Sequence, residues 1–185
     1  LGFDVRIADL VERGVEIAEL DEAYAARVAR SPLPSGRTGY RTLADYNGDM
    51  TALATRYPDL VKRFALKRPS LDGRTIYGVE VGHRVRTPLA GQPTFLLMGV
   101  HHAREWPSGE LAMEFAVDLA TSFGKDRRIT ALLKKARVIV VPVVNVDGFH
   151  ISRSAAPLGN FSRFDYEMKR KNCSISASTT AAFLG

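Results

Sequence analysis

Two side chains of the zinc-binding type, a histidine and a glutamate, lie three residues apart as His102 and Glu105. Imidazole nitrogen and carboxylate oxygen both bind Zn²⁺, at about 2.0–2.2 Å. The pair lies between a short apolar run, residues 94–98, and a helix start at Pro107. Ligands of open α/β sheets bind in the crevice at the carboxyl ends of the strands, so this placement favours a metal site. The spacing leaves a second interpretation open, in which both are polar loop residues that cap the helix, with Glu105 favoured by the helix dipole.

The elements on either side of this pair predict an α/β fold. Residues 94–98 and 138–144 are continuous apolar runs, as is typical of buried strands. Between them, the pattern predicts a helix from Pro107 to Gly124 and a shorter helix over residues 127–136. This order predicts a right-handed crossover in a largely parallel sheet, with residues 138–144 as a central strand. The longer helix is expected to bury a stripe of large side chains with alanines beside it, namely Leu111, Phe115, Leu119, Phe123, Ala112, Ala116 and Ala120.

Upstream of these elements, a segment with two prolines and a glycine, residues 31–36, marks a boundary. Thr42 and Asp45 are placed as a helix cap and its partner, and Asp72-Gly73 predicts a turn. From Asn145 onward the periodicity disappears. The expected elements are a strand over 3–7, a helix over 19–30, a helix over 40–57 that Pro58 ends, an apolar segment over 60–66 and a strand over 76–81.

The chain is basic, with 26 Lys and Arg against 20 Asp and Glu, a net charge of +6 and a pI near 9.7. The positive side chains are dispersed among apolar helical positions, which favours solvated faces over a nucleic-acid groove. No nucleic-acid partner is therefore expected beyond non-specific charge attraction. No apolar stretch approaches the roughly 18 residues of a membrane span, so no membrane partner is expected either. The single cysteine, Cys173, excludes an internal disulfide.

Several motifs together resemble the zinc carboxypeptidases, the carboxypeptidase A-like metallopeptidases. His102-Ala103-Arg104-Glu105-Trp106 resembles the family signature H-x-R-E-W. Asp72-Gly73-Arg74 is similar to an early turn, and Asn145-Val146-Asp147-Gly148-Phe149 to the N-P-D-G-F loop. Residues 124–130 resemble a segment of bacterial members, and residues 166–173 the Y-x-M-W-R-K-N-C stretch of actinobacterial members, with Lys169 in place of the usual tryptophan. The ordered set runs from about residue 38 to 175 and identifies the chain as a member of this family, of the actinobacterial type.

The resemblance implies a fold and a domain division. Residues 1–34 would be a propeptide remnant and its linker. Residues 35–185 would be the N-terminal part of the catalytic domain, a truncated α/β unit whose partial sheet is mixed or mostly parallel and has helices on its flanks. The missing Met and the absence of a recognisable signal peptide fit a mature product, a fragment or a trimmed chain.

The resemblance also implies roles for individual residues. His102 and Glu105 would be two of three protein ligands of a catalytic Zn²⁺, and the third ligand would lie beyond this chain. Arg170 would bind substrate and polarise the scissile carbonyl, as suits a guanidinium that stays cationic. Arg104 would line the substrate subsite beside the zinc. Trp106 is expected to pack the loop.

Three other histidines have no expected role at the metal. His101 would be a neighbour of the ligands, and His83 and His150 would be surface residues. The family's Asn-Arg pair, closing tyrosine and general-base glutamate would also lie beyond residue 185. Cys173 would be a free thiol in this chain, because its partner in the family lies downstream.

The implied parent reaction is removal of the C-terminal residue of a peptide or protein by a zinc-activated water, and the implied location is extracellular. The 185-residue chain is expected to be inactive alone. Where downstream strands are missing, the strand over 138–144 is expected to expose an unpaired side and to promote self-association. Two alternatives stay open: a zinc deacylase that shares H-x-x-E, and a non-catalytic module of the same fold.

Overall fold

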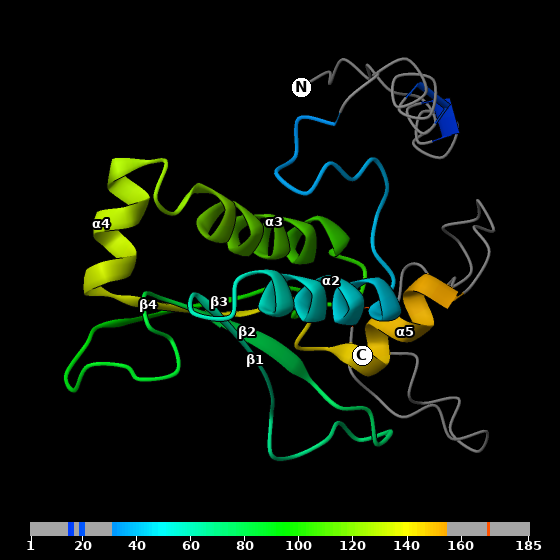
Figure 1. The fold of residues 1–185 in the computed structure, drawn as a ribbon. Coiled ribbons are helices and arrows are strands. Elements are labelled where there is room, and N and C mark those ends of the chain that lie inside the picture. The colour runs from blue at the N-terminus through cyan, green and yellow to red at the C-terminus, as the bar shows by residue number, and fades with distance from the viewer. Residues whose placement is uncertain (1–14, 17–18, 21–30, 155–169, 171–185) are drawn as a thin grey trace, which may run out of the picture.

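The computed structural model describes residues 15–16, 19–20, 31–154 and 170 (Figure 1). Helices and strands alternate along the described chain, as the sequence predicts for an α/β fold. The elements are α2 (Leu43–Arg56), β1 (Val61–Ala65), β2 (Tyr77–Val81), β3 (Thr94–Met98), α3 (Trp106–Ser122), α4 (Arg127–Lys135), β4 (Arg137–Val141) and α5 (Val146–Ser154).

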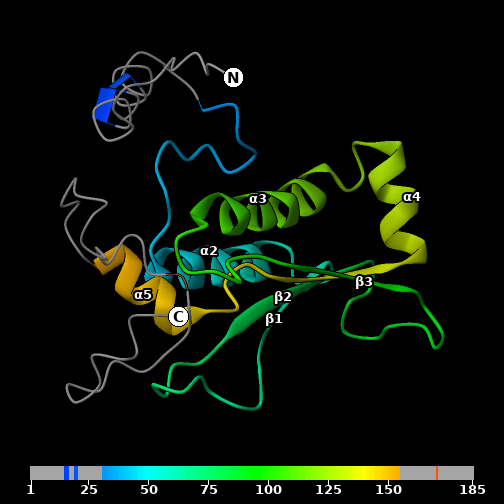
Figure 2. The same cartoon turned by 180° about the vertical axis from the view of Figure 1, so that it is seen from behind.

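The four strands form one mixed sheet in the order β1-β2-β4-β3. β3 and β4 pair in parallel, with Phe95 opposite Val138, as the predicted crossover requires. β1–β2 and β2–β4 pair antiparallel, so the sheet is mixed, and the described part has one parallel pair. Helices α2 and α3 lie side by side over one face of the sheet, with α4 at one end and α5 at the other (Figures 1 and 2). The opposite face carries no helix among the described residues.

Helix α2 begins where the sequence predicts. Thr42 is its N-cap and forms a capping box with Asp45, in which the Thr42 hydroxyl accepts from the Asp45 amide and the Asp45 carboxylate accepts from the Thr42 amide. These hydrogen bonds hold the pKa of Asp45 at about 2, below its ordinary 3.8. The helix ends at Arg56, two residues before Pro58, and buries Tyr46, Met50 and Leu53.

Helix α3 buries most of the expected stripe, since Leu119 and its three alanines are buried and Phe115 and Phe123 pack against the core, but Leu111 departs from the expectation. Leu111 is 70% exposed, and the buried positions are Gly109, Ala112, Met113, Glu114, Ala116, Val117, Leu119 and Ala120. The reason is close approach. A Cβ on Gly109 would lie 2.7 Å from both the Tyr46 hydroxyl and the Val100 side chain. Small residues therefore face the sheet and α2, and the large Leu111 is turned outward.

The unpaired edge also differs from the expectation. β4 is paired on both sides, by β2 and β3, because the parallel crossover adds β3 outside it. It is therefore a central strand, and the expected unpaired side of the strand over 138–144 is wrong. Among the described strands the apolar edge is β3, where Phe95, Leu96 and Met98 are 55%, 51% and 43% exposed.

Helix α5 occupies a stretch where the sequence gives no periodic signal. Its first residues supply buried contacts, Val146 and Phe149, so tertiary packing stabilises it more than amphipathic repetition does. The strand expected over 3–7 lies outside the described residues. Of the helix expected over 19–30, the structure describes Glu19 and Leu20, both helical. Within the described stretches, no helix is long and apolar enough to cross a membrane.

Candidate metal and substrate site

The loop that carries His102 is held at the carboxyl end of β3. The Gly99 amide donates to the Val141 carbonyl at 3.0 Å, and the amides of Val144 and Asn145 donate to the carbonyls of Gly99 and Val100 at 3.1 Å each. Hydrogen bonds between the segments that follow β3 and β4 thus continue the pairing beyond the ends of these two strands. Val100 is fully buried with a φ of 47°, a left-handed conformation that is strained for a β-branched residue. Such strain persists only where surrounding contacts fix the backbone.

His102 and Glu105 face one another across this loop. The His102 Nδ1 and the Glu105 Oε1 lie 2.8 Å apart, and the side chains are 36% and 49% exposed. At this distance the two side chains are hydrogen-bonded to each other, and both atoms are of the type that binds Zn²⁺. Glu105 is the N-cap of α3, yet its side chain makes no capping hydrogen bond. Glu105 therefore lies where the capping interpretation places it and is favoured by the helix dipole, but its carboxylate makes no capping hydrogen bond.

Ser108 fixes the backbone between the two donors. Its hydroxyl donates to the Glu105 carbonyl at 2.7 Å and accepts from the Val100 amide at 2.8 Å. The Glu105 amide in turn donates to the His102 carbonyl at 3.1 Å. Ser108, in the first turn of α3, therefore links Val100 at the start of the loop to Glu105 at its end.

Arg170 reaches the same loop from far along the chain. Its carbonyl accepts from the Ala103 amide at 2.9 Å and from the Asn145 carboxamide at 3.1 Å. Ala103 lies between His102 and Glu105, so the main chain of Arg170 contacts the metal-donor loop directly. Arg170 is exposed, and so is Arg104, for which the described residues provide no hydrogen bond or ion pair. The structure thus brings Arg170 to the loop and leaves both guanidinium groups accessible.

The described residues hold fewer potential metal ligands than a catalytic zinc site needs. Within the described stretches, no group of three or more His, Cys, Asp and Glu side chains is placed to hold a metal ion. His102 and Glu105 supply two donors, and a catalytic zinc normally takes three protein ligands. His101 is exposed beside the pair, without a contact to Glu105 among the described residues.

Trp106 packs the loop, as expected. Its indole Nε1 donates to the Ser152 hydroxyl at 2.8 Å. The Tyr40 ring meets it edge-on with centroids 5.6 Å apart, and the Arg153 guanidinium lies 4.5 Å over its centroid. Arg153 also donates to the carbonyls of Tyr40 and Arg41. Trp106 therefore joins α5 and the segment before α2 to the start of α3.

A buried arginine anchors that preceding segment. The Arg41 side chain is fully buried and pairs with Asp49 at 2.8 Å, Glu114 at 2.7 Å and Glu110. Burial lowers the pKa of Arg41, but hydrogen bonds to these carboxylates outweigh it and raise the pKa overall. Ser35 donates to Glu114 from both its amide, at 2.9 Å, and its hydroxyl, at 2.5 Å. This network fixes residues 35–41 against α3.

A second buried charge joins two of the motifs. Asp147 is fully buried and accepts from the Ser70 hydroxyl at 2.7 Å and from the Arg74 guanidinium at 2.9 Å. Burial raises the pKa of Asp147, but these hydrogen bonds outweigh it and lower the pKa below its ordinary 3.8. The turn at 72–74 is thereby held against the start of α5, next to Asn145.

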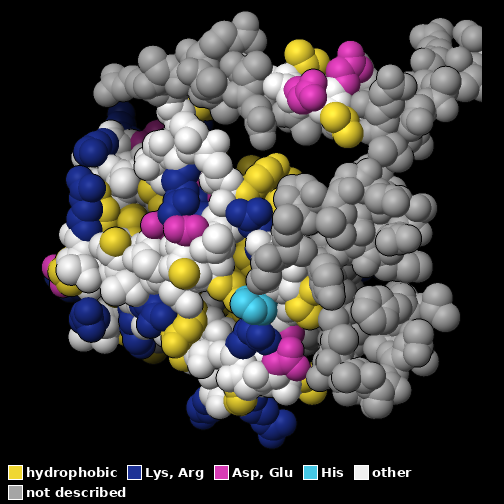
Figure 3. Space-filling view, turned by 90° about the vertical axis from the view of Figure 1, so that its right-hand side faces the viewer, with side chains coloured by type: hydrophobic (Ala, Val, Ile, Leu, Met, Phe, Trp, Pro, Cys, Tyr) yellow, Lys and Arg dark blue, Asp and Glu magenta, His cyan; other side chains and the backbone are white. Residues whose placement is uncertain are grey.

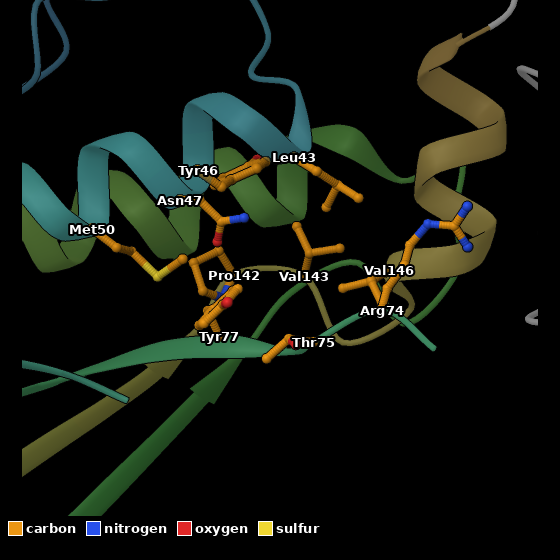
Figure 4. A pocket seen from close by; sticks show the side chains of 10 residues that line it. All are labelled: Leu43, Tyr46, Asn47, Met50, Arg74, Thr75, Tyr77, Pro142, Val143 and Val146. Carbon is orange, nitrogen blue, oxygen red and sulfur yellow. The ribbon is translucent and has the colours of Figure 1, made fainter. Parts of the chain in front are cut away.

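A cavity of about 240 Å³ lies elsewhere, between α2 and the sheet (Figure 4). Its walls include Met50, Tyr77 and Val143, and Arg74 contributes its stem while its guanidinium extends toward α5. Neither His102 nor Glu105 lines it. On the α5 side of the molecule, the coloured surface mixes charged side chains of both signs with apolar ones (Figure 3).

Comparison with known proteins decides the family. A family model described as zinc carboxypeptidase matches residues 46–178, well over half of the chain. The chain belongs to the zinc carboxypeptidase family. Among curated relatives, carboxypeptidase B of Bos taurus is 34% identical over 97 residues, 52% of this chain and 22% of its own length. The inactive metallocarboxypeptidase ECM14 of Ajellomyces capsulatus (strain H143) is 32% identical over 100 residues, 54% of this chain and 17% of its own length.

Solved structures show the same fold. The thrombin activatable fibrinolysis inhibitor superposes with a TM-score of 0.67 at 23% identity, over 89% of this chain and 38% of that one. Carboxypeptidase A of Helicoverpa armigera gives 0.65 at 19% identity, over 89% of this chain and 36% of that one. The chain therefore spans less than two fifths of these structures and about a fifth of the curated relatives.

A search of the sequence for metal-binding side chains did not identify three residues that support the loop of His102 and Glu105. Ser108 and Asn145 bind the loop through hydrogen bonds, and Asp147 binds the turn at 72–74. Asn145 and Asp147 lie in the motif 145–149, so the resemblance marks the segment without indicating which contacts it makes. Ser108 carries no sequence signal beyond its place in the first turn of a helix.

Proposed function

We propose that this chain is part of a metallocarboxypeptidase that hydrolyses C-terminal residues of peptides or proteins. Family membership supports the reaction class. The observation that carries the site is the convergence of His102 and Glu105, which are hydrogen-bonded at 2.8 Å and stay 36% and 49% exposed, with no capping hydrogen bond from the Glu105 carboxylate. These two residues would hold the zinc. When bound, zinc supplies Lewis-acid polarisation and lowers the pKa of a coordinated water.

Arg170 and Arg104 would bind the substrate. A guanidinium stays cationic and offers several donors, so it suits a carbonyl oxygen that gains negative charge. The contact of the Arg170 main chain with Ala103 supports this role, because it keeps the arginine beside the donor loop. The exposure of both side chains leaves them accessible to a peptide.

The proposal also divides the chain into two parts. Residues 1–34 would be a propeptide remnant with its linker, and residues 35–185 would be the N-terminal part of the catalytic domain. Ser35 supports the boundary, because its amide and hydroxyl both bind Glu114 on α3. An extracellular location and an actinobacterial type rest on the resemblance alone. Self-association through β3 is supported by its exposed Phe95 and Leu96.

We also propose that these 185 residues are inactive by themselves. The described part supplies two metal donors and no third within reach. A non-catalytic role of the same fold is the second candidate, favoured by the likeness to a relative named an inactive metallocarboxypeptidase. The two candidate functions differ in one expectation: the metallocarboxypeptidase requires that His102 and Glu105 bind zinc, and the non-catalytic role does not.

Calorimetric titration with zinc tests the site. The chain should bind one zinc ion, and His102→Ala or Glu105→Gln should weaken binding at least about tenfold, the usual effect of even an outer-shell change. His101→Ala is the matched control, since it removes an exposed histidine one residue away. Equal loss in all three variants, or none in any, would contradict the assignment.

A peptidase assay with added zinc tests inactivity. The purified chain should release no C-terminal residue from a peptide. Turnover that Glu105→Gln abolishes would show that the 185 residues complete a catalytic site, and this part of the proposal would then fail.

A further inference from the structure

The Asn145 side chain lies at the junction of three backbone segments. It is 4% exposed. Its Nδ2 donates to the His101 carbonyl at 3.2 Å and to the Arg170 carbonyl at 3.1 Å, and its Oδ1 accepts from the Gly148 amide at 3.0 Å. One carboxamide therefore contacts the metal-donor loop, the segment of Arg170 and the first turn of α5.

From this geometry we propose that Asn145 is a positioning residue, which sets the place of Arg170 relative to His102 and Glu105. The inference rests on the proposed function for the roles of those three residues. The distances themselves do not depend on it.

An amide is the side chain that this junction requires. Asn145 Nδ2 donates to both carbonyls while its Oδ1 accepts from the Gly148 amide, so the group that makes these contacts carries a donor and an acceptor at one site. The packing leaves little freedom, because a Cβ on Gly148 would lie 2.7 Å from the Asn145 Oδ1 and 2.8 Å from the Ala103 side chain. A carboxylate could still accept from Gly148, yet its second oxygen would face two carbonyl oxygens and repel them.

The Arg170 carbonyl has two donors, the Ala103 amide and Asn145. Removal of the side-chain donor should loosen the Arg170 segment and weaken the remaining bond from Ala103. The helix contact at Gly148 would survive. Asn145→Asp therefore separates positioning from folding.

The test uses the metal-free 185-residue chain with Asn145→Asp, and Asn47→Asp as the control with the same change of charge. An arginine-specific protease measures access to the Arg170 carbonyl, with cleavage after the exposed loop residue Arg86 as internal reference. Amide exchange of Ala103, measured by NMR against Gly99, reports the second bond. Asn145→Asp should raise both rates about tenfold, the effect of one hydrogen bond, and leave the reference rates unchanged.

A purely structural role would move the Arg86 and Gly99 rates together with the others and lower the thermal midpoint. That result, or unchanged rates at Arg170 and Ala103, would overturn the inference. If Asn145→Asp does not fold, Asn145→Ser replaces it in the test. The shorter serine cannot reach the His101 and Arg170 carbonyls, so the same changes in the Arg170 and Ala103 rates are expected. Because these rates need no metal, a chain without zinc affinity that still responds to Asn145→Asp contradicts the proposed function and supports the positioning role.

Discussion

At the residue scale, buried charges determine how the zinc carboxypeptidase loop is supported. Arg41 and Asp147 are fully buried, and each binds groups from other elements. Breaking such a pair is costly because the remaining partner keeps a charge that water cannot reach. The Arg41 carbonyl accepts from Arg153, which lies over the Trp106 ring beside Glu105. Asp147 lies two residues after Asn145, whose side chain binds the His101 carbonyl.

Replacement of the buried Arg41 should lower the free energy of unfolding more than replacement of its half-buried neighbour Arg37. Arg41→Ala leaves the buried Glu114 carboxylate without its positive partner, although Ser35 still donates to it, and should lower the free energy of unfolding by about 3–5 kcal/mol. Arg37→Ala removes a surface pair with Asp45 and Asp49 and should cost about 1 kcal/mol or less. Urea denaturation of both variants measures the difference, and equal losses would contradict the buried network.

The pH dependence of stability should report Asp147. Its folded pKa lies below the ordinary 3.8, so its contribution is complete above that value and is lost as pH falls through the folded pKa. Unfolding free energy should therefore decline below about pH 4, and Asp147→Asn should flatten this slope by up to about 1.4 kcal/mol per pH unit. Parallel slopes for the two proteins would argue against a depressed pKa.

At the scale of the elements, close packing of α3 against β3 and α2 positions the site. Gly109 lets the helix approach Val100, the strained residue that precedes the loop. Ser108, one residue before Gly109, accepts a hydrogen bond from the Val100 amide through its hydroxyl. The start of α3 therefore supports the loop in two ways: the Ser108 side chain binds its backbone, and the lack of a side chain at Gly109 lets the helix pack closely against it.

Gly109→Ala should destabilise the chain although alanine is the better helix former. The added Cβ would clash at 2.7 Å with Tyr46 and Val100, and overpacking costs about 1–3 kcal/mol. Gly48→Ala in α2, where nothing lies within 4 Å, should instead stabilise by up to about 1 kcal/mol. Thermal unfolding of the two variants should show shifts of opposite sign, and a rise in both would refute the packing argument.

Sequence patterns predicted most elements, because capping and apolar periodicity are local signals. Thr42 and Asp45 mark the start of α2, and the apolar run of β4 marks a central strand. Most of the buried face of α3 was predicted as well, but the exposure of Leu111 was not, since it depends on how near the sheet and α2 lie to Gly109. Helix α5 and the Asn145 contacts depend on chain segments that lie far apart in sequence. At the site, spacing pointed to His102 and Glu105 but did not determine where the Glu105 carboxylate would point.

At the scale of the whole molecule, the mixed sheet leaves β3 at the edge of the described part. The apolar side chains of Phe95, Leu96 and Met98 are each more than two fifths exposed. An exposed hydrophobic edge strand favours pairing with another chain. The fold thus presents the metal-donor loop at the end of its least protected strand.

This edge should make the 185-residue chain associate. Sedimentation velocity should detect oligomers at micromolar concentrations, and Leu96→Lys should reduce them, because an edge lysine opposes strand pairing. Leu71→Lys, at an exposed leucine outside the strands, should leave association unchanged. A monodisperse monomer would contradict the prediction.

X-ray absorption at the zinc edge tests most directly whether His102 and Glu105 hold zinc. The zinc-loaded chain should show scattering from one imidazole and from carboxylate oxygen at about 2.0–2.2 Å. His102→Ala should remove the imidazole signal, and His101→Ala should leave it intact. An imidazole signal that persists in His102→Ala, or disappears in His101→Ala, would contradict the account.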